Sequence, residues 1–360
     1  MKQWLRQEKG RLVWLGTVTA ALGLFFLLRQ SRAVQDTLCR YILLPWEQAV
    51  GRLCGHLGAS VAEILIISLT CAAFFALTRW IRRLIATRFD GTVFFRGVLT
   101  FACAGLTVWA GFRLLWTPFY GAESFQEKSG ITARGGTTAE LRELTARFAT
   151  ALSACADTVA RDENGCFAEP RREIIADAAH CYDALYGEFP FLRGDTCPPK
   201  EFVLSSILSR FRFTGFYFPF TGEANLNVDS PAAFLGATVC HEMAHQRGIA
   251  SEQACNFLGV LAATRSDSAA YRYSGYLEGY LYLSNALYRV DENTWWEIRD
   301  SLPETVRRDL RENDLYWARF TGRVSKTVQT VYDGFLKANG DENGVRSYGM
   351  VVDLLLAYYG

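Results

Sequence analysis

Residues 237–256 read ATVCHEMAHQRGIASEQACN. Small and apolar residues lead into His241, and a glycine, Gly248, separates this helical pattern from a second one that begins at Ser251. Glycine after a helix and serine before the next are common stop and start signals. The stretch therefore predicts two helices in the interior of a soluble domain, joined by a short turn.

The first of these helices carries His241, Glu242 and His245 in the pattern H-E-x-x-H. Residues four apart share one face of a helix, so both imidazoles can reach one metal ion. Glu242 is turned about 100° away, where it can meet a zinc-bound water whose pKa the metal has lowered toward ~7. The pattern predicts a catalytic zinc site with Glu242 as general base. The alternative is a polar helix face without metal, but unpaired buried histidines are costly.

Catalytic zinc keeps three protein ligands and one open position, so the two histidines need a partner. Glu252 is the best candidate, because Gly248 lets the chain turn back and Ser251 begins the helix that presents it. Asn256, one turn later, would hydrogen-bond a ligating histidine. Glu252 could instead be a first-turn carboxylate favoured by the helix dipole, and Glu278 in YLEGY is the second candidate ligand.

A hydrolase of this kind also needs a donor that stabilises the oxyanion of the transition state. Tyrosines on an amphipathic helix are usually core residues, so these candidates are weaker than the ligands. They are Tyr273, Tyr276, Arg272, His180, Arg346 and Tyr348.

Before the soluble domain, the first 117 residues contain three apolar runs, Leu12–Leu28, Leu57–Thr78 and Gly97–Leu115. Each approaches the ~20 residues that cross ~30 Å of hydrocarbon. Buried core helices and, for the first run, a cleaved signal peptide are the alternatives. The following SRAVQDTLCR has no small-x-small cleavage site, which favours a retained anchor. We expect three transmembrane helices in residues 1–117, with Glu63 near the membrane interface.

The charges of the loops predict an orientation. The first loop holds Arg32, Arg40 and Arg52, offset by Asp36 and Glu47. The flanks on the other side are more basic, with Lys2, Arg6, Lys9 and Arg11 before the first run and Arg79, Arg82, Arg83, Arg88 and Arg96 between the second and third. The positive-inside rule places these flanks in the cytoplasm. Residues 118–360 would then lie outside it.

The remaining residues predict a mostly α soluble domain over 138–360, after a linker over 118–137. Thr137 and Glu140 form a capping box that begins a helix ending near Val159. Long helices are expected over REIIADAAHCYDALYGEF and LYWARFTGRVSKTVQTVYDGFLKANG, and a core helix over RSYGMVVDLLLAYY. FRFTGFYFPFTGEANLNV predicts one or two short strands, with Pro219 indicating a sheet edge. Six of the ten cysteines fall in this domain, and their pairing cannot be read from the sequence.

The segment HEMAHQRGIASE resembles two branches of the zinc peptidases. Metzincins have a third histidine where this chain has Ser251, so the pair Glu252 and Asn256 fits the gluzincins better. Over residues 200–360 the chain resembles a family of bacterial membrane proteins of unknown function, on FYFPFTGEANLNV, CHEMAHQRGIASEQACNFL, YRYSGYL and GVRSYGMVVDLLLAYY. The resemblance to zinc peptidases implies a mainly helical α+β, zincin-like domain, and the gluzincin likeness implies that GFYFPFTGEANLN holds an edge strand that pairs with substrate. An ordinary core strand is the alternative for this segment.

These observations favour a membrane-anchored zinc metallopeptidase of the plasma membrane that acts on peptides or proteins outside the cytoplasm. It would bind about one Zn²⁺ per chain. The net charge of +1 argues against a nucleic-acid partner. Two alternatives remain: a non-catalytic membrane sensor or scaffold that retains zinc, and a hydrolase of a non-peptide envelope substrate. Only an enzyme would lose its function, but not its metal, when Glu242 is replaced.

Overall fold

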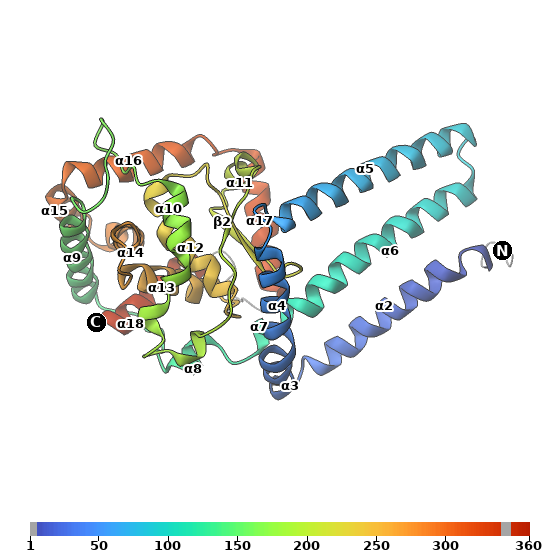
Figure 1. The fold of residues 1–360 in the computed structure, drawn as a ribbon, viewed down its shortest axis with the longest axis horizontal. Helices are drawn as coiled ribbons and strands as arrows, with labels where there is room; N and C mark the ends of the chain where they lie inside the picture. The colour runs from blue at the N-terminus through green and yellow to red at the C-terminus, as the bar shows by residue number, and fades with distance from the viewer. Residues whose placement is uncertain (1–5, 340–346) are drawn as a thin grey trace.

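A computed structural model describes residues 6–339 and 347–360 of the chain. Its secondary structure is mostly helical, with one small sheet (Figure 1). The predicted fold class is therefore confirmed.

Three helices are long and apolar enough to cross a membrane: α2 (Lys9–Leu28), α5 (Val61–Ala86) and α6 (Gly91–Leu115). α5 begins four residues later than expected because Ser60 caps it, its hydroxyl accepting a hydrogen bond from the Glu63 amide. The same helix continues through the basic residues up to Ala86. In Figure 1 the start of α2 and the α5–α6 turn lie at one end of the three helices and the soluble domain at the other. The beginning of α2 and the basic segment that joins α5 to α6 are thus at the same end of the structure.

The chain between α2 and α5 folds onto the soluble domain. It forms α3 (Arg32–Leu38), a π-helical turn η1 (Cys39–Leu43) and α4 (Leu44–Gly55). Gly222, at a φ of +63°, lies so close to α4 that a Cβ there would come within 2.1 Å of the Glu47 carbonyl oxygen. The first 117 residues thus hold more than membrane helices. The segment expected as a linker also contains short helices, α7 (Thr117–Gly121) and α8 (Phe125–Ser129).

The soluble domain is built around α13 (Glu252–Thr264), which is buried along its whole length. It packs against α12 (Leu235–His245), α14 (Ala269–Val290) and α18 (Ser347–Tyr359), and α14 also packs against α9 (Thr138–Cys155). Two glycines of α14 allow this close approach. A Cβ at Gly279 would meet the Phe148 ring of α9 at 2.3 Å, and one at Gly275 would meet the Thr264 amide at 2.7 Å.

Several predicted helix boundaries are confirmed, and two long helices are not. Thr137 and Glu140 form the expected capping box of α9, and the run after residue 347 is a core helix. The stretch expected as one helix from Arg172 breaks after α10 (Arg171–Ala176) into the 3-10 turns η2 (Asp177–His180) and η3 (Asp183–Leu185). The last long run divides at Gly322 into α16 (Glu304–Ala318) and α17 (Arg323–Asn339). The other helical elements are α11 (Ser205–Phe211), α15 (Glu292–Ser301), η4 (Pro190–Leu192) and η5 (Ala232–Phe234).

The sheet has the strand order β1-β3-β2. β3 (Glu223–Leu226) is central, parallel to β1 (Lys200–Glu201) and antiparallel to β2 (Gly215–Phe218). β2 is an edge strand that ends just before Pro219, as the proline predicted. Its outer edge is free of strand pairing within the described residues.

Two carboxylates join the sheet to the start of α5. Glu223 of β3 accepts hydrogen bonds from the Val61 and Ala62 amides at 3.1 and 2.7 Å. Glu63 of α5 accepts in turn from the Val203 and Leu204 amides at 2.9 and 2.8 Å. Glu63 thus lies at the first turn of its span, where the sequence placed it, and is bound to the soluble domain. Glu223 thus binds the first turn of α5, and Glu63 of α5 binds the backbone that follows β1. These reciprocal contacts fix the position of the membrane helix relative to the sheet.

We expect Glu223→Ala to destabilise the full chain by about 2 kcal/mol, since two buried amides at the α5 terminus lose a charged acceptor. Thermal unfolding of the detergent-solubilised protein measures this, with Glu201→Ala, an exposed glutamate of β1, as the control. Equal melting of the two variants would contradict the role given to Glu223.

Candidate metal centre

The turn between α12 and α13 brings the predicted ligands together. α12 ends at His245, and Gly248 adopts a φ of +78° that reverses the chain. The Gly248 and Ile249 amides donate to the carbonyls of His245 and Ala244 at 2.9 and 3.2 Å, which satisfies the end of the helix. Ser251 then caps α13, as expected, and its hydroxyl accepts from the Ala254 amide. Glu252 therefore faces the last turn of α12.

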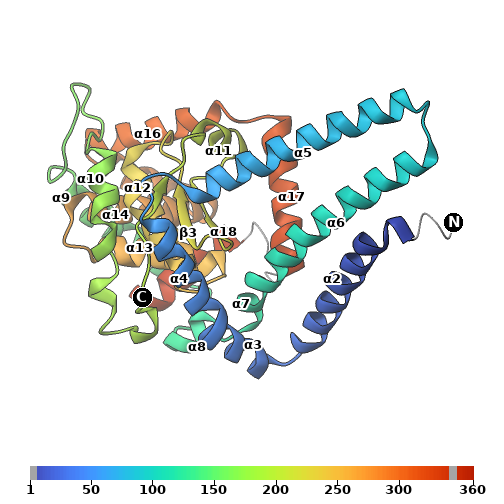
Figure 2. The same cartoon turned by 45° about the vertical axis from the view of Figure 1, so that its right-hand side comes forward.

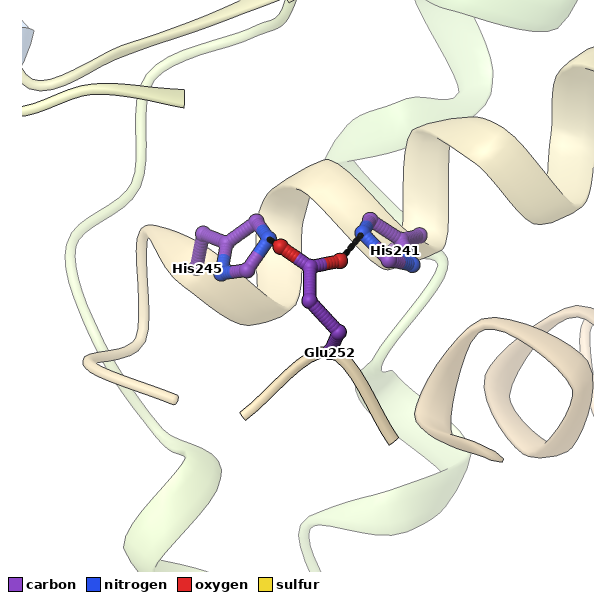
Figure 3. Close-up of side chains that lie close together, drawn as sticks. All are labelled: His241, His245 and Glu252. Carbon is purple, nitrogen blue, oxygen red and sulfur yellow. Dashed lines mark ion pairs between the residues drawn. The ribbon is translucent and has the colours of Figure 1, made fainter. Parts of the chain in front are cut away.

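Figure 3 shows the Glu252 carboxylate lying between the two imidazoles, with one oxygen directed to each. Glu252 Oε2 lies 3.3 Å from His241 Nε2, and Oε1 lies 3.8 Å from His245 Nε2. One ligand atom from each residue falls within 4.8 Å of the other two. The three side chains thus form a compact donor set of two nitrogens and one carboxylate.

Neighbouring groups fix the orientation of these donors. His245 Nδ1 lies 2.8 Å from the Ile249 carbonyl oxygen, so this nitrogen carries the proton and the Nε2 lone pair points toward Glu252. Asn256 is hydrogen-bonded to His241, as expected of a residue behind a ligand. The Tyr332 hydroxyl of α17 donates to Glu252 Oε1 at 2.8 Å.

The charges in the cluster are unevenly shared. Burial disfavours charge on Glu252, but the hydrogen bond and charge of His241 and the charge of His245 lower its pKa to about 2. Burial opposes charge on His241 as well, yet Glu252 and Glu242 raise its pKa to about 9. Burial lowers the pKa of His245 to about 4. Glu252 and His241 are therefore an ion pair beside a neutral His245, and a cation at their centre would take the place of the His241 proton.

Glu242 lies beside this cluster and is held differently. Its Oε2 is buried and has no hydrogen-bond partner among the described residues, and burial raises the pKa of the carboxyl to about 8. The backbone of β2 covers it, because a Cβ on Gly215 would meet Glu242 Oε1 at 2.7 Å. A buried carboxylate without a partner is costly, so its retention here needs an explanation beyond packing.

All four residues line one cavity of about 1380 Å³. Its walls come from β2, α11, α14, α16 and α17 and from the membrane helices α5 and α6. Asn256 and Glu278 also line it, and burial raises the pKa of Glu278. The cluster of His241, His245 and Glu252 is therefore open on one side to a large cavity, and the edge strand forms part of its wall.

Four of the six predicted transition-state donors lie away from this cavity. Tyr273 is buried against Asp309, and Arg272 donates to the Ser266 and Asp267 carbonyls. Tyr276 packs edge-on against Phe148, and His180 is exposed and pairs with Asp183. Arg346 and the side chain of Tyr348 lie outside the described residues.

Residues that the sequence did not indicate complete the site. Tyr332 lies on an amphipathic helix far along the chain, and only the amphipathic pattern of α17 could have pointed to a buried face there. Trp116, directly after α6, and Tyr217 of β2 pack against the His245 ring, with centroids 5.7 and 6.4 Å away. No motif distinguishes these aromatic residues in the sequence.

A second acidic cluster, Cys166, Asp309 and Glu312, is structural. Asp309 accepts hydrogen bonds from Arg161 Nη1 at 2.5 Å, from the Phe167 amide at 2.8 Å and from the Tyr273 hydroxyl. Both carboxylate oxygens of Asp309 therefore already accept hydrogen bonds from the protein. All ten cysteines lie in the described residues and are free thiols, with Cys240 and Cys255 buried as expected.

We expect Gly215→Ala to lower hydrolytic activity about a hundredfold, since the added methyl group would displace the Glu242 carboxylate by close to an ångström. Metal content should stay unchanged, because no ligand is touched. Elemental analysis and hydrolysis assays on the same preparation test this. Activity equal to wild type would show that the carboxylate has no fixed place under β2.

The comparisons with known proteins give one result. Residues 39–356 match the family model described as "Protein of unknown function (DUF3810)". No curated protein and no solved structure matches the chain. The match covers most of the sequence, so the chain belongs to the DUF3810 family.

Proposed function

We propose that this DUF3810 protein is a membrane-anchored zinc metallopeptidase. The observation that carries the proposal is the arrangement around α12. Three donors converge on one point, and an unpartnered buried carboxylate, Glu242, lies beside them under a free strand edge. A site that only stabilised the fold would normally close with four protein ligands and has no use for Glu242.

The donor set suits zinc. Two imidazole nitrogens and one carboxylate are a common ligand set of catalytic zinc, and the fourth position would face the cavity. The Ile249 carbonyl and Asn256 orient the histidines in the way that partners of ligating histidines do. The donor residues are also nearly buried, so an ion would replace the His241 proton in a site already built for positive charge.

Each residue has a defined role in peptide hydrolysis. Bound zinc would lower the pKa of a water molecule and polarise the scissile carbonyl. Glu242 would act as the general base that accepts a proton from the water that adds to the carbonyl carbon, and it would return that proton to the amine as the C–N bond breaks. The free edge of β2 pairs with the extended peptide and holds its carbonyl over His241 and His245. Tyr332 is the group nearest the ligands that can donate to the oxyanion, if it turns from Glu252.

The proposed location is the plasma membrane, with the soluble domain outside the cytoplasm. It rests on the basic residues near Lys9 and in the 79–96 loop, which lie together at the end opposite the soluble domain. Peptide or protein substrates would accordingly be extracytoplasmic.

The second candidate is a non-catalytic sensor that retains zinc. One observation favours it: Trp116 connects the end of α6 directly to the His245 ring, so a change in the membrane helices would reach the metal ligand. The isolated Glu242 carboxylate has no role in such a protein, and for this reason we prefer the peptidase.

Metal analysis of the full chain in detergent tests the proposal. We expect about one zinc per chain, hydrolysis of a mixed peptide substrate, loss of hydrolysis on chelation, and recovery when zinc is returned. Calcium and magnesium should not restore activity, since they prefer oxygen ligands. Zinc binding without any hydrolysis would favour the sensor, and a folded protein without zinc would contradict both.

A further inference from the structure

The metal centre lies at the boundary of the membrane region. Trp116 directly follows Leu115, the last residue of α6, and its ring packs 5.7 Å from the His245 ring. The same tryptophan stacks against Tyr217 of the edge strand, with ring centroids 4.9 Å apart. A peptide held by β2 would therefore be cleaved close to the point where a polypeptide leaves the bilayer.

The cavity also continues between two membrane helices. Ile66 and Ile67 near the start of α5 and Phe112 near the end of α6 line it together with the metal ligands. These membrane-level positions are apolar. Ile67 lines the cavity and is 42% exposed, so its side chain is not packed in a core.

α5 and α6 contact each other mainly near their shared turn. There the Trp80 indole donates to the Val93 carbonyl at 3.2 Å, and its ring lies 5.6 Å from Phe101. Toward the soluble domain Phe112 of α6 packs instead against Phe335 of α17, at 5.2 Å. Both views show the two helices close at the turn and apart at the soluble domain (Figures 1 and 2). The result is a wedge between α5 and α6 whose wide end is the cavity.

Exposed apolar side chains surround this wide end. Val203 is 82% exposed directly before α11, and Val331 of α17 is 68% exposed. Ile207 of α11 and Val331 also line the cavity. Large exposed apolar residues on a soluble domain mark a surface that binds a membrane or an apolar part of another protein. An apolar path thus runs from the bilayer, through the wedge, to the metal ligands.

We propose that the substrate is a membrane-inserted polypeptide, with its transmembrane helix in the wedge between α5 and α6 and its first residues outside the bilayer on β2. This inference rests on the proposed peptidase activity and adds the class of substrate. A helical anchor is specified because the cavity opens between the diverging ends of two transmembrane helices, at Ile66, Ile67 and Phe112. A peptide portion is specified because β2 offers unpaired backbone groups to an extended chain.

A crosslinking experiment tests the position of the anchor without turnover. The full-length Glu242→Gln protein, in phosphatidylethanolamine–phosphatidylglycerol vesicles, carries benzoylphenylalanine in place of Ile67 or, as the matched control, Leu69. Leu69 is exposed on the same helix but does not line the cavity. The probe is a polyleucine transmembrane helix followed by a short randomised segment. We expect about tenfold more adduct at position 67, because a seated anchor has a high local concentration there. Equal yields would overturn the proposal.

A turnover experiment separates this inference from the proposed activity. The wild-type protein is given the same randomised segment in three forms: with the transmembrane helix, with an acyl chain, and free in solution. We expect the helix-anchored form to be cleaved about tenfold faster than the acylated form, since both are concentrated at the membrane and only one fills the wedge. Ile67→Trp should slow the helix-anchored form relative to the soluble one, whereas Leu69→Trp should change neither.

The outcomes have different meanings. Equal cleavage of the soluble and helix-anchored forms would overturn the wedge as an anchor site and leave the peptidase intact. Faster cleavage of the acylated form would overturn the helical anchor. No cleavage of any form by the zinc-loaded protein would overturn the peptidase, and this inference with it.

Discussion

Glu242→Gln is expected to reduce peptide hydrolysis by about a thousandfold and to leave zinc content unchanged. Glutamine has nearly the shape of glutamate and keeps the contact with Gly215, but it cannot accept the proton of the attacking water. The carboxylate is directed to no protein partner among the described residues, so the fold does not depend on its charge. Burial raises the pKa of the Glu242 carboxyl to about 8, so the free protein holds it mainly as the neutral acid, and glutamine is a neutral side chain of nearly the same shape. The variant should therefore unfold close to the wild-type temperature.

Parallel measurements of zinc, hydrolysis and thermal unfolding on Glu242→Gln check this prediction. The control for a change of charge alone is Glu201→Gln, because Glu201 is an exposed glutamate of β1. Unchanged hydrolysis would remove Glu242 as the base. Loss of zinc together with activity would instead place Glu242 among the ligands, which its position under β2 does not suggest.

The local chemistry of the chain predicted what lies within a few residues. Ser251, Gly248 and the Thr137–Glu140 capping box end or begin helices through contacts with their immediate neighbours, and all three were confirmed. The convergence of His241, His245 and Glu252 follows from two such signals, because the turn at Gly248 is short enough to leave little choice of direction.

Contacts between distant residues were beyond the sequence pattern. The helix expected from Arg172 breaks where Tyr182 is buried and its hydroxyl donates to the Cys240 carbonyl at 2.8 Å, an interaction across 58 residues. α4 folds onto the soluble domain because Gly222 admits its backbone. Tyr332 reaches Glu252 across 80 residues. In the sequence, neither the spacing nor the residue types of these pairs distinguish them from ordinary core residues.

The arrangement of the three membrane helices relative to one another could not be predicted from the sequence either. Hydropathy predicted the three spans but not all of their ends, since α5 continues eight residues past the predicted end at Thr78 and α6 begins six residues before Gly97. It also treats each span alone. The divergence of α5 and α6 arises from the Trp80 contacts at one end and from α17 at the other. The position of the metal centre relative to the bilayer depends on Trp116, one residue past a span, and only the folded chain places it against His245.

Glu252→Ala is expected to lower zinc affinity more than about a hundredfold. Removing a group that only supports a ligand costs up to about a hundredfold, and removing a ligand should cost more. Two histidines alone leave zinc with too few protein donors. The variant should also be less stable than wild type without metal, because the buried His241 cation loses its paired carboxylate. Competition with a zinc-binding dye measures the affinity, and thermal unfolding of the apoprotein measures the stability.

Glu278→Ala is the matched control, since it removes a second, half-buried glutamate that lines the same cavity and lies near His241. Burial raises the pKa of Glu278, whereas the pKa of Glu252 is lowered, so Glu278 is less suited than Glu252 to bind a cation. Zinc affinity should therefore stay within a few fold of wild type in this variant. If Glu278→Ala lost zinc and Glu252→Ala kept it, the third ligand would come from α14. The Glu252 carboxylate, between two imidazoles and held by Tyr332, would then have only a structural role.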